Sequence, residues 1–183
     1  MVYSPSDDSF LLADEVKKYI ESLSNKNIKV LDMGSGSGIQ AITAIESGIK
    51  KQNVLCADIN DEAIKFLKKL KLKAIKTNLF SKIKKTNKFS LIIFNAPYLP
   101  ESKYDKQPDT TAGKKGYEII TEFLKQAKAH LAKEGAILLL FSSLSKPKII
   151  LKEASALRYN SKLLAKKGVG FFEKLFVYEF FIS

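Results

Sequence analysis

Apolar residues along this chain follow two alternating patterns, short continuous runs and longer segments of helical spacing. Between residues 8 and 23, apolar side chains recur every three or four positions, which predicts an amphipathic helix. The run at 91–94 is too short for an ordinary helix and is typical of a strand buried on both faces, and the first strand is expected at 28–33. Strands that alternate with helices predict a doubly wound α/β sheet.

The remaining elements follow from the same two patterns. Further strands are expected at residues 54–57, 72–76, 136–141, 161–165 and 175–182, and further helices at 39–45, 61–67, 119–131 and 147–157. Ile39, Ile42 and Ile45 are expected to share one face of their helix. Gly135 is expected to end the helix at 119–131, and the glycines at 168 and 170 to join the last two strands as an antiparallel pair.

The strand at 91–94 ends in four residues that suggest chemistry: Asn95, Ala96, Pro97 and Tyr98. Pro97 favours an extended Ala96, so that the Ala96 carbonyl and the Asn95 side chain converge beside the Tyr98 ring. Two acceptors and a π face suit a flat substrate nitrogen that carries hydrogens, in an amide or a nucleobase. Taken alone, these residues fit an ordinary turn equally well.

A glycine loop, Gly34-Ser35-Gly36-Ser37-Gly38, lies between the first strand and the next helix. Residues without a β-carbon let a ligand approach the backbone, and the N–H groups of the helix's first turn point toward it. The spacing departs from the Gly-x-Gly-x-x-Gly fingerprint, which counts against a nicotinamide dehydrogenase. Asp58 ends the next strand and is placed to accept hydrogen bonds from the hydroxyls of a ribose.

The composition indicates one domain, residues 1–183, with 45% hydrophobic residues and a substantial core. Apolar runs fall short of the roughly 20 residues that span a membrane, and no signal sequence is evident, so a cytoplasmic protein is expected. The single cysteine, Cys56, lies in an apolar run and is expected to be a core residue. It excludes a disulfide framework and a thiolate zinc site.

The net charge of +12 raises the question of a nucleic-acid partner. Arg158 is the only arginine, and lysines fall on almost every predicted polar face, which favours a generally lysine-rich surface instead. The single histidine, His130, sits late in a predicted helix and is assigned no function; no metal site is expected. The polar segment at 99–115 follows the Asn95 turn directly and is expected to be a substrate loop.

Taken together, these motifs resemble the class I S-adenosylmethionine-dependent methyltransferases of the HemK/PrmC type, which methylate protein glutamine. The likeness covers nearly the whole chain and is greatest to the compact archaeal and eukaryotic branch, which lacks the bacterial N-terminal helical domain. Each motif is weak alone, but their order is specific. The segments that carry the resemblance are residues 3–12, 31–38, 57–60, 78–79, 94–98, 112–116 and 172–179.

The resemblance implies a Rossmann-like fold, with a mostly parallel seven-stranded sheet and an antiparallel C-terminal strand. It also implies how the cofactor, S-adenosylmethionine, is held. Ser9, Asp32 and Gly34 would surround its methionine portion, the loop glycine Gly36 and the catalytic Asn95 would lie beside it, Asp58 would bind the ribose, and Asn78 with Leu79 the adenine. Two positions depart from the family pattern: Ala96 replaces a proline, and Asn78 replaces an aspartate. Both replacements keep an acceptor oxygen.

The expected reaction transfers a methyl group to a glutamine side-chain nitrogen, and by resemblance the substrate is the Gly-Gly-Gln loop of a class I translation termination factor. A small zinc-binding activator is expected on the edge strand near Leu72 to Lys76. One alternative is an N-methyltransferase acting on adenine or guanine in RNA or DNA, with nucleic acid not favoured as a partner. The other is a nucleotide-binding protein without catalysis.

Overall fold

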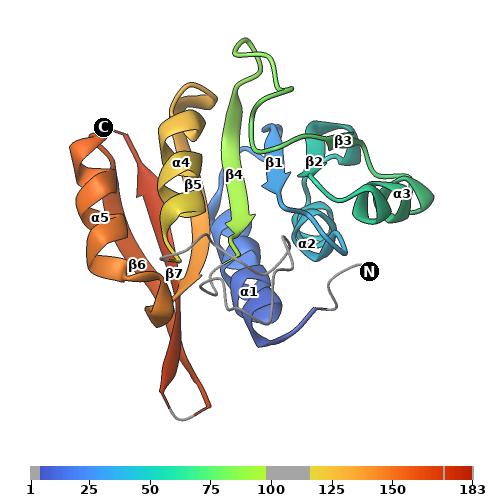
Figure 1. Cartoon of the computed structure of the whole chain (residues 1–183). Coiled ribbons are helices and arrows are strands. Elements are labelled where there is room, and N and C mark those ends of the chain that lie inside the picture. Colours follow the sequence, from blue (N-terminus) through green and yellow to red (C-terminus); the bar gives the residue numbers. More distant parts are fainter. Residues whose placement is uncertain (1–4, 98–115, 171, 183) are drawn as a thin grey trace.

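The computed structural model describes residues 5–97, 116–170 and 172–182, which form one seven-stranded sheet with helices on both faces (Figure 1). The strands are β1 (Val30–Met33), β2 (Val54–Asp58), β3 (Ala74–Lys76), β4 (Phe89–Asn95), β5 (Leu131–Ser142), β6 (Asn160–Val169) and β7 (Glu173–Phe181). The α-helices are α1 (Asp7–Ser22), α2 (Ile39–Glu46), α3 (Asp61–Lys69), α4 (Glu118–Ala127) and α5 (Pro147–Ala156), and the short 3-10 turns are η1 (Lys51–Asn53) and η2 (Ser143–Ser145).

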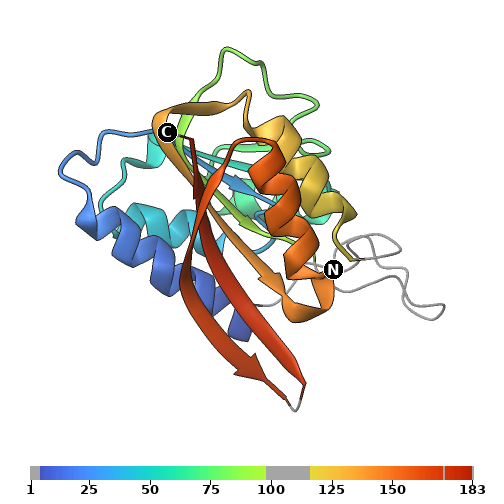
Figure 2. The same cartoon turned by 90° about the vertical axis from the view of Figure 1, so that its left-hand side faces the viewer.

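The strand order is β3-β2-β1-β4-β5-β7-β6. Strands β1 to β5 pair in parallel, whereas β7 runs antiparallel to both β5 and β6. This confirms the predicted fold class, including the C-terminal antiparallel pair. The short strand β3 lies at one edge, as expected, and the β6–β7 hairpin closes the other and extends past the end of the sheet (Figure 2).

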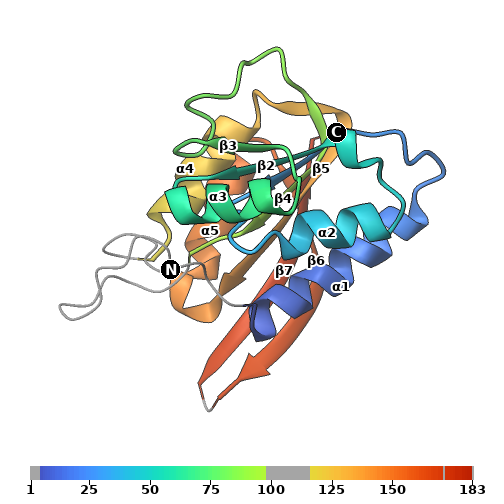
Figure 3. The same ribbon diagram turned by 90° about the vertical axis from the view of Figure 1, so that its right-hand side faces the viewer.

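Alternate residues of the central strand face two separate cores. Leu91 and Ile93 of β4 pack into the cluster that contains α1, α2 and α3, whereas Ile92 and Phe94 pack into the cluster that contains α4 and α5. Figure 3 shows the first three helices together on one side of the sheet. A strand buried on both sides must be apolar throughout, which is why residues 91–94 form a continuous run.

Two expectations about the fourth helix are wrong. Helix α4 ends at Ala127, and Leu131 already belongs to β5. Gly135 therefore lies inside a strand instead of stopping a helix, next to Glu134, which has a φ of 61°. The pairing of β4 with β5 shifts register there, and an added β-carbon on Gly135 would come within 3.0 Å of the backbone oxygens of Ala132 and Phe89.

The inner face of α2 also differs from the expected one. Its buried residues are Gln40, Ala41 and Ala44, while Ile42 and Ile45 are only partly buried. Small side chains occupy the inner face, so α2 lies close to its neighbours. Among the described residues, no helix is long and apolar enough to cross a membrane.

Candidate functional site

Three of the predicted site residues lie at or next to the ends of neighbouring strands and share one face of the sheet. Asp32 lies in register with Cys56 of β2 and Ile93 of β4. Asp58 and Asn95 come two residues after those partners, so the period of two along a strand puts all three polar residues on one face. Cys56 and Ile93 are buried there among α1, α2 and α3, as expected for Cys56.

The glycine loop between β1 and α2 needs glycine for two different reasons. Gly34, Gly36 and Gly38 all have positive φ, at 62°, 48° and 79°. A β-carbon on Gly38 would come within 2.7 Å of the Leu67 side chain of α3, so this glycine permits close helix packing. A β-carbon on Gly36 would meet nothing nearer than the Gly34 carbonyl oxygen at 4.0 Å. The backbone at Gly36 is therefore open to approach.

Ser35 fixes this loop to the end of β2. Its backbone N–H donates to the Ala57 carbonyl over 3.2 Å, and its Oγ accepts from the Ala57 N–H over 3.1 Å. The same hydroxyl donates to the Asp32 carbonyl oxygen over 2.7 Å. The loop is held by β1 and β2 together, so its open backbone has a defined position.

Asp32 lies beneath the loop as a buried carboxyl group. Its Oδ2 accepts from the Ala41 N–H in the first turn of α2 over 3.2 Å. Burial is the main reason that the pKa of Asp32 is raised to about 7; the negative charge of Asp58 also raises this pKa, and the hydrogen bonds from Ala41 and Ser35 lower it. A cation placed beside this carboxyl group would favour its ionised form and lower its pKa.

Asp58 links the loop to the start of α3. Its Oδ2 accepts from the Gly36 N–H and its Oδ1 from the Asn60 N–H, both over 2.8 Å. Asn60 in turn caps α3, with Oδ1 accepting from the Glu62 N–H over 2.8 Å. The carboxylate predicted to bind a ribose thus also shapes the loop next to it.

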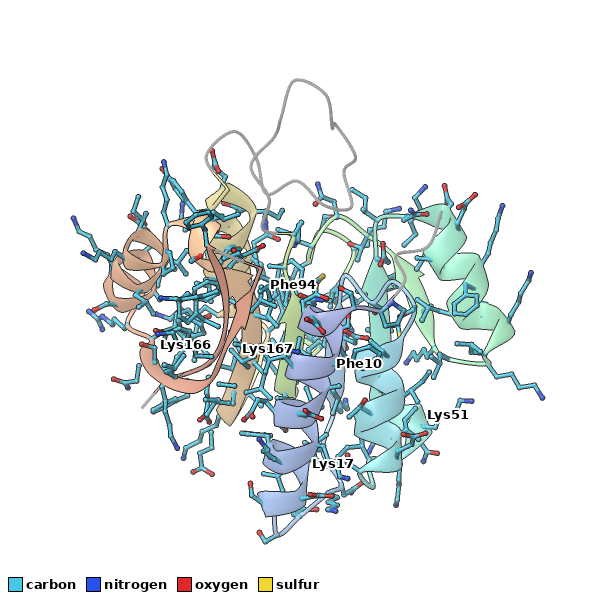
Figure 4. The ribbon with its side chains drawn as sticks, turned by 90° about the horizontal axis from the view of Figure 1, so that it is seen from below. Phe10, Lys17, Lys51, Phe94, Lys166 and Lys167 are labelled. Carbon is cyan, nitrogen blue, oxygen red and sulfur yellow. The ribbon has the colours of Figure 1, made fainter. Side chains whose placement is uncertain are left out.

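Asn95 is joined to the first turn of α1. Its Nδ2 donates to Asp8 Oδ2 over 3.0 Å, while its Oδ1 is buried and accepts no hydrogen bond from the described residues. Figure 4, viewed from below, shows this first turn, marked by Phe10, beside the end of β4, marked by Phe94. Ala96 follows as a buried residue whose N–H donates to the Leu140 carbonyl over 3.3 Å.

Ser9 is held in the same turn of α1. Its side chain and its backbone N–H both donate to Asp8 Oδ1, and its carbonyl accepts from Gln40 Nε2 of α2 over 2.9 Å. Ser9 is therefore held next to the first turn of α2, with its hydroxyl, N–H and carbonyl groups already engaged, and its role at the cofactor stays a prediction. Pro97 is partly buried after Ala96, whereas Tyr98 and the expected substrate loop at 99–115 lie outside the described residues.

The turn after β3 is arranged by Thr77. Its N–H donates to the Asp58 carbonyl over 2.8 Å, and its hydroxyl donates to the Leu79 carbonyl over 3.0 Å. Leu79 is buried with a φ of 45°, whereas the Asn78 side chain is exposed. The two residues expected at the adenine thus sit beside the end of β2, where Asp58 also lies.

His130 is a structural residue. It is buried in the turn between α4 and β5, instead of late in a helix, and stacks on Phe80 with ring centroids 4.6 Å apart. Burial lowers its pKa, and its Nδ1 lies 3.2 Å from the Asn87 carbonyl oxygen. The His130 carbonyl accepts from the Phe89 N–H at the start of β4, the opposite end of that strand from Asn95.

Sequence reasoning missed Asp8, Gln40 and Thr77 as parts of this site. Acidic residues are common in the first turn of a helix, so the start of α1 is by itself a sufficient reason for Asp7 and Asp8. A signal was present, because Asp8 precedes Leu12, Val16 and Ile20 at intervals of four, on the face that α1 buries. A carboxylate on an apolar face indicates a specific polar partner.

Comparison with known proteins agrees with this geometry. Residues 11–166 match the family described as the methyltransferase small domain. A putative protein N5-glutamine methyltransferase of Methanocaldococcus jannaschii is 31% identical over 96% of this chain and 90% of its own length. A release factor glutamine methyltransferase of Fusobacterium nucleatum is 34% identical over 57% of this chain, which spans only 30% of that protein.

A solved structure shares the fold over the full chain. The Mtq2–Trm112 complex of E. cuniculi, described as responsible for methylation of the translation termination factor eRF1, contains a chain that matches with a TM-score of 0.79 and 21% identity. The match covers 100% of this chain and 99% of that one. By the family match and the archaeal relative, this chain belongs to the methyltransferase small domain family and, within it, to the HemK/PrmC-type protein glutamine methyltransferases.

Proposed function

We propose that this chain transfers a methyl group from S-adenosylmethionine to the side-chain amide nitrogen of a protein glutamine. Membership of the family supports methyl transfer as the reaction, and the orientation of the Asn95 side chain supports an amide nitrogen as the methyl acceptor. The Asn95 amide group donates to Asp8 and leaves a buried carbonyl oxygen without a donor among the described residues. Such an acceptor is costly to bury unless a donor reaches it, and a glutamine amide supplies one.

The described residues suit this cofactor. Gly36 leaves its backbone open, and Asp58 beside it offers carboxylate oxygens to the two ribose hydroxyls. Asp32, raised in pKa, would lose its proton when the cofactor's ammonium group lies nearby, and Leu79 offers an apolar surface next to Asp58 for the adenine. S-adenosylmethionine, when bound, supplies an electrophilic methyl group on a sulfonium sulfur.

Asn95 and Ala96 would orient the acceptor. An amide nitrogen is a poor nucleophile because its lone pair is delocalised, so its alignment with the methyl carbon matters. Asn95 Oδ1 and the Ala96 carbonyl would each accept one N–H of the glutamine and hold the nitrogen toward the methyl group. These oxygens would stabilise the positive charge that develops on the nitrogen as it gains the methyl group, before the nitrogen releases one proton to solvent water.

The proposed substrate is the Gly-Gly-Gln loop of a class I translation termination factor. The E. cuniculi neighbour is described as acting on such a factor. Glycines before the glutamine let the backbone enter a narrow site without steric conflict. The formal charge of +12 adds long-range attraction for an acidic substrate surface, which affects the association rate more than the chemistry.

One competition experiment tests this function. The purified enzyme is given the termination factor and total RNA together, with radiolabelled S-adenosylmethionine, and the label is followed into protein and RNA. We expect label in the factor, on the glutamine of Gly-Gly-Gln, and none after Asn95→Ala. Label in RNA alone would show that the methyl acceptor is a nucleobase and not a protein glutamine. Cofactor binding without transfer to either would support a non-catalytic protein.

We also infer a partner on the β3 edge of the sheet. Among the described strands, the short β3 pairs with β2 alone, and Phe66 of the adjoining helix α3 and Leu70 directly after it are 40% and 38% accessible. An open strand edge beside exposed apolar side chains fits a protein interface. The E. cuniculi neighbour was solved with Trm112, and the proposed partner is a small activator of that kind, with a zinc site of its own.

A further inference from the structure

Asp8 occupies a position where a carboxylate is unexpected. Helix α1 buries residues at intervals of four, and Asp8 is the first of this row, before Leu12, Val16 and Ile20. It is only 3% exposed. Burial of a charged group costs several kcal/mol unless hydrogen bonds compensate for lost water, by the usual estimate of about 2–7 kcal/mol even for an uncharged polar group. Its contacts therefore need an explanation beyond helix capping.

The two oxygens of Asp8 serve different neighbours. Oδ1 accepts from Ser6 Oγ over 2.7 Å, from the Ser9 N–H over 2.6 Å and from Ser9 Oγ over 3.2 Å. These bonds stay within the first turn of α1. Oδ2 instead accepts from Asn95 Nδ2 over 3.0 Å, across 87 residues of sequence. Only this second contact reaches the end of β4.

The contact decides which way the Asn95 amide faces. An asparagine amide carries a donor and an acceptor of nearly equal shape, so either can face a neighbour. An ionised carboxylate only accepts, and it therefore requires the NH2 group of Asn95 to face Asp8. The carbonyl oxygen must then face the other way. That oxygen is the buried acceptor left without a partner among the described residues.

We propose that Asp8 is a positioning residue for methyl transfer, which holds the Asn95 amide in the orientation that presents its carbonyl oxygen to the acceptor N–H. The inference rests on the proposed function for the identity of that acceptor. The orientation itself follows from the contact between the two side chains. Without it, the Asn95 amide can turn over and present its own N–H groups to a substrate N–H.

The test compares the loss of kcat in two substitutions at position 8. A positioning role predicts that Asp8→Asn is the more harmful of the two, whereas a purely structural role predicts that Asp8→Ala is. In Asp8→Asn, the donors in the first turn of α1 still require an oxygen, so the new amide keeps its oxygen toward Ser6 and Ser9 and turns its NH2 toward Asn95. Asn95 must then turn its oxygen toward α1 and its donors toward the substrate. In Asp8→Ala, Asn95 is free to rotate and adopts the productive orientation part of the time.

We therefore expect Asp8→Asn to lower kcat on the order of 100-fold and Asp8→Ala only about tenfold, with the Kd for S-adenosylmethionine changed little. If Asp8 merely caps the helix, the isosteric asparagine will be the milder change. Asp7→Asn is the matched control, since Asp7 lies in the same turn and has its ion pair with Lys167 of the hairpin, 3.2 Å away. Figure 4 shows Lys167 on the side of α1 nearest the hairpin.

An exchange of the two side chains adds a rescue. In Asp8→Asn combined with Asn95→Asp, the amide at position 8 donates to a carboxylate on β4, whose second oxygen again faces the substrate as an acceptor. We expect the pair to recover at least part of the kcat lost in Asp8→Asn. A wild-type rate in Asp8→Asn would overturn the proposal, and so would a double variant that recovers none of the kcat lost in Asp8→Asn.

A direct observation separates this inference from the proposed function. In 15N-labelled enzyme, the side-chain NH2 signals of Asn95, identified by their loss in Asn95→Ala, should be protected from solvent exchange and should shift in Asp8→Asn but not in Asp7→Asn. If the Asn95 NH2 signals exchange freely with solvent and have the same chemical shifts in wild type, Asp8→Asn and Asp7→Asn, the positioning role is wrong. If wild-type enzyme labels no glutamine, the proposed function fails, and these signals still decide the orientation.

Discussion

The backbone N–H of Gly36 donates to Asp58 Oδ2 over 2.8 Å, so the carboxylate at the end of β2 holds the loop at the end of β1. Both strands are parallel neighbours, and Asp58 follows Ala57, the register partner of Met33. The contact needs a positive φ at Gly36, where a glycine is favoured. Loop shape and the proposed ribose site therefore depend on the same side chain.

Asp58→Ala should weaken S-adenosylmethionine binding. The proposed bonds from the ribose hydroxyls to this carboxylate are charge-assisted, and such bonds contribute about 1.5–3 kcal/mol, or roughly 10- to 100-fold in Kd. Titration calorimetry measures the change. Asp61→Ala is the matched control, because Asp61 is an exposed carboxylate three residues later that pairs with Lys76. Equal affinities for Asp58→Ala and wild type would remove Asp58 from the cofactor site.

The stability of the cofactor-free protein should fall with rising pH because of Asp32. The pKa of Asp32 is about 7 in the folded protein and 3.8 in the ordinary unfolded reference, so the folded state binds more protons between these values. Its contribution is complete below about pH 4 and is lost as the pH rises through 7. Asp32→Asn removes the titration but keeps the shape.

Urea unfolding of both proteins at about pH 5 and about pH 8 isolates this effect. The other carboxylates titrate in both proteins, so their contributions to the free energy of unfolding cancel in the difference between variant and wild type. We expect the free energy of unfolding of Asp32→Asn, relative to wild type, to rise by roughly 2–3 kcal/mol between the two pH values. A constant difference would mean that Asp32 has an ordinary pKa in the folded protein.

The sequence predicts most of the sheet because β2 and β4 are short apolar runs that end in the polar residues Asp58 and Asn95. The same period of two places Asp32, Asp58 and Asn95 on one face, so part of the site follows from the pattern. The start of β5 could not be predicted, since Lys133 and Glu134 interrupt its apolar run and the register shift depends on pairing with Phe89. The contact of Asn95 with Asp8 joins distant segments, and local pattern carries no information about it.

The exposed apolar side chains of Phe66 in α3 and Leu70 directly after it should affect both the solubility of the isolated chain and the binding of its partner. Phe66→Ser combined with Leu70→Ser removes apolar surface beside the β3 edge, so we expect less self-association of the isolated chain and weaker capture of a Trm112-type activator. Gel filtration and a pull-down measure the two effects. Phe172→Ser, at a side chain 94% exposed on the β6–β7 hairpin, is the control and should leave activator capture unchanged. Unaltered capture by the α3 variant would place the activator elsewhere.

Substitutions at two glycines of the loop between β1 and α2 should have different effects on cofactor binding and on stability. Gly36→Ala and Gly38→Ala both place a side chain at positive φ, with a conformational cost of roughly 1–2 kcal/mol each. At Gly38 the β-carbon also lies 2.7 Å from a methyl group of Leu67 and 3.2 Å from one of Leu72, so these side chains or α2 itself must shift. At Gly36 the β-carbon enters open space instead, on the backbone that the cofactor is proposed to approach.

We therefore expect Gly38→Ala to lower the Tm more, and Gly36→Ala to raise the Kd for S-adenosylmethionine more relative to its loss of stability. Thermal unfolding and calorimetry on the same preparations compare the two, and a Gly36→Ala protein with wild-type affinity would show that this face of the loop does not touch the cofactor.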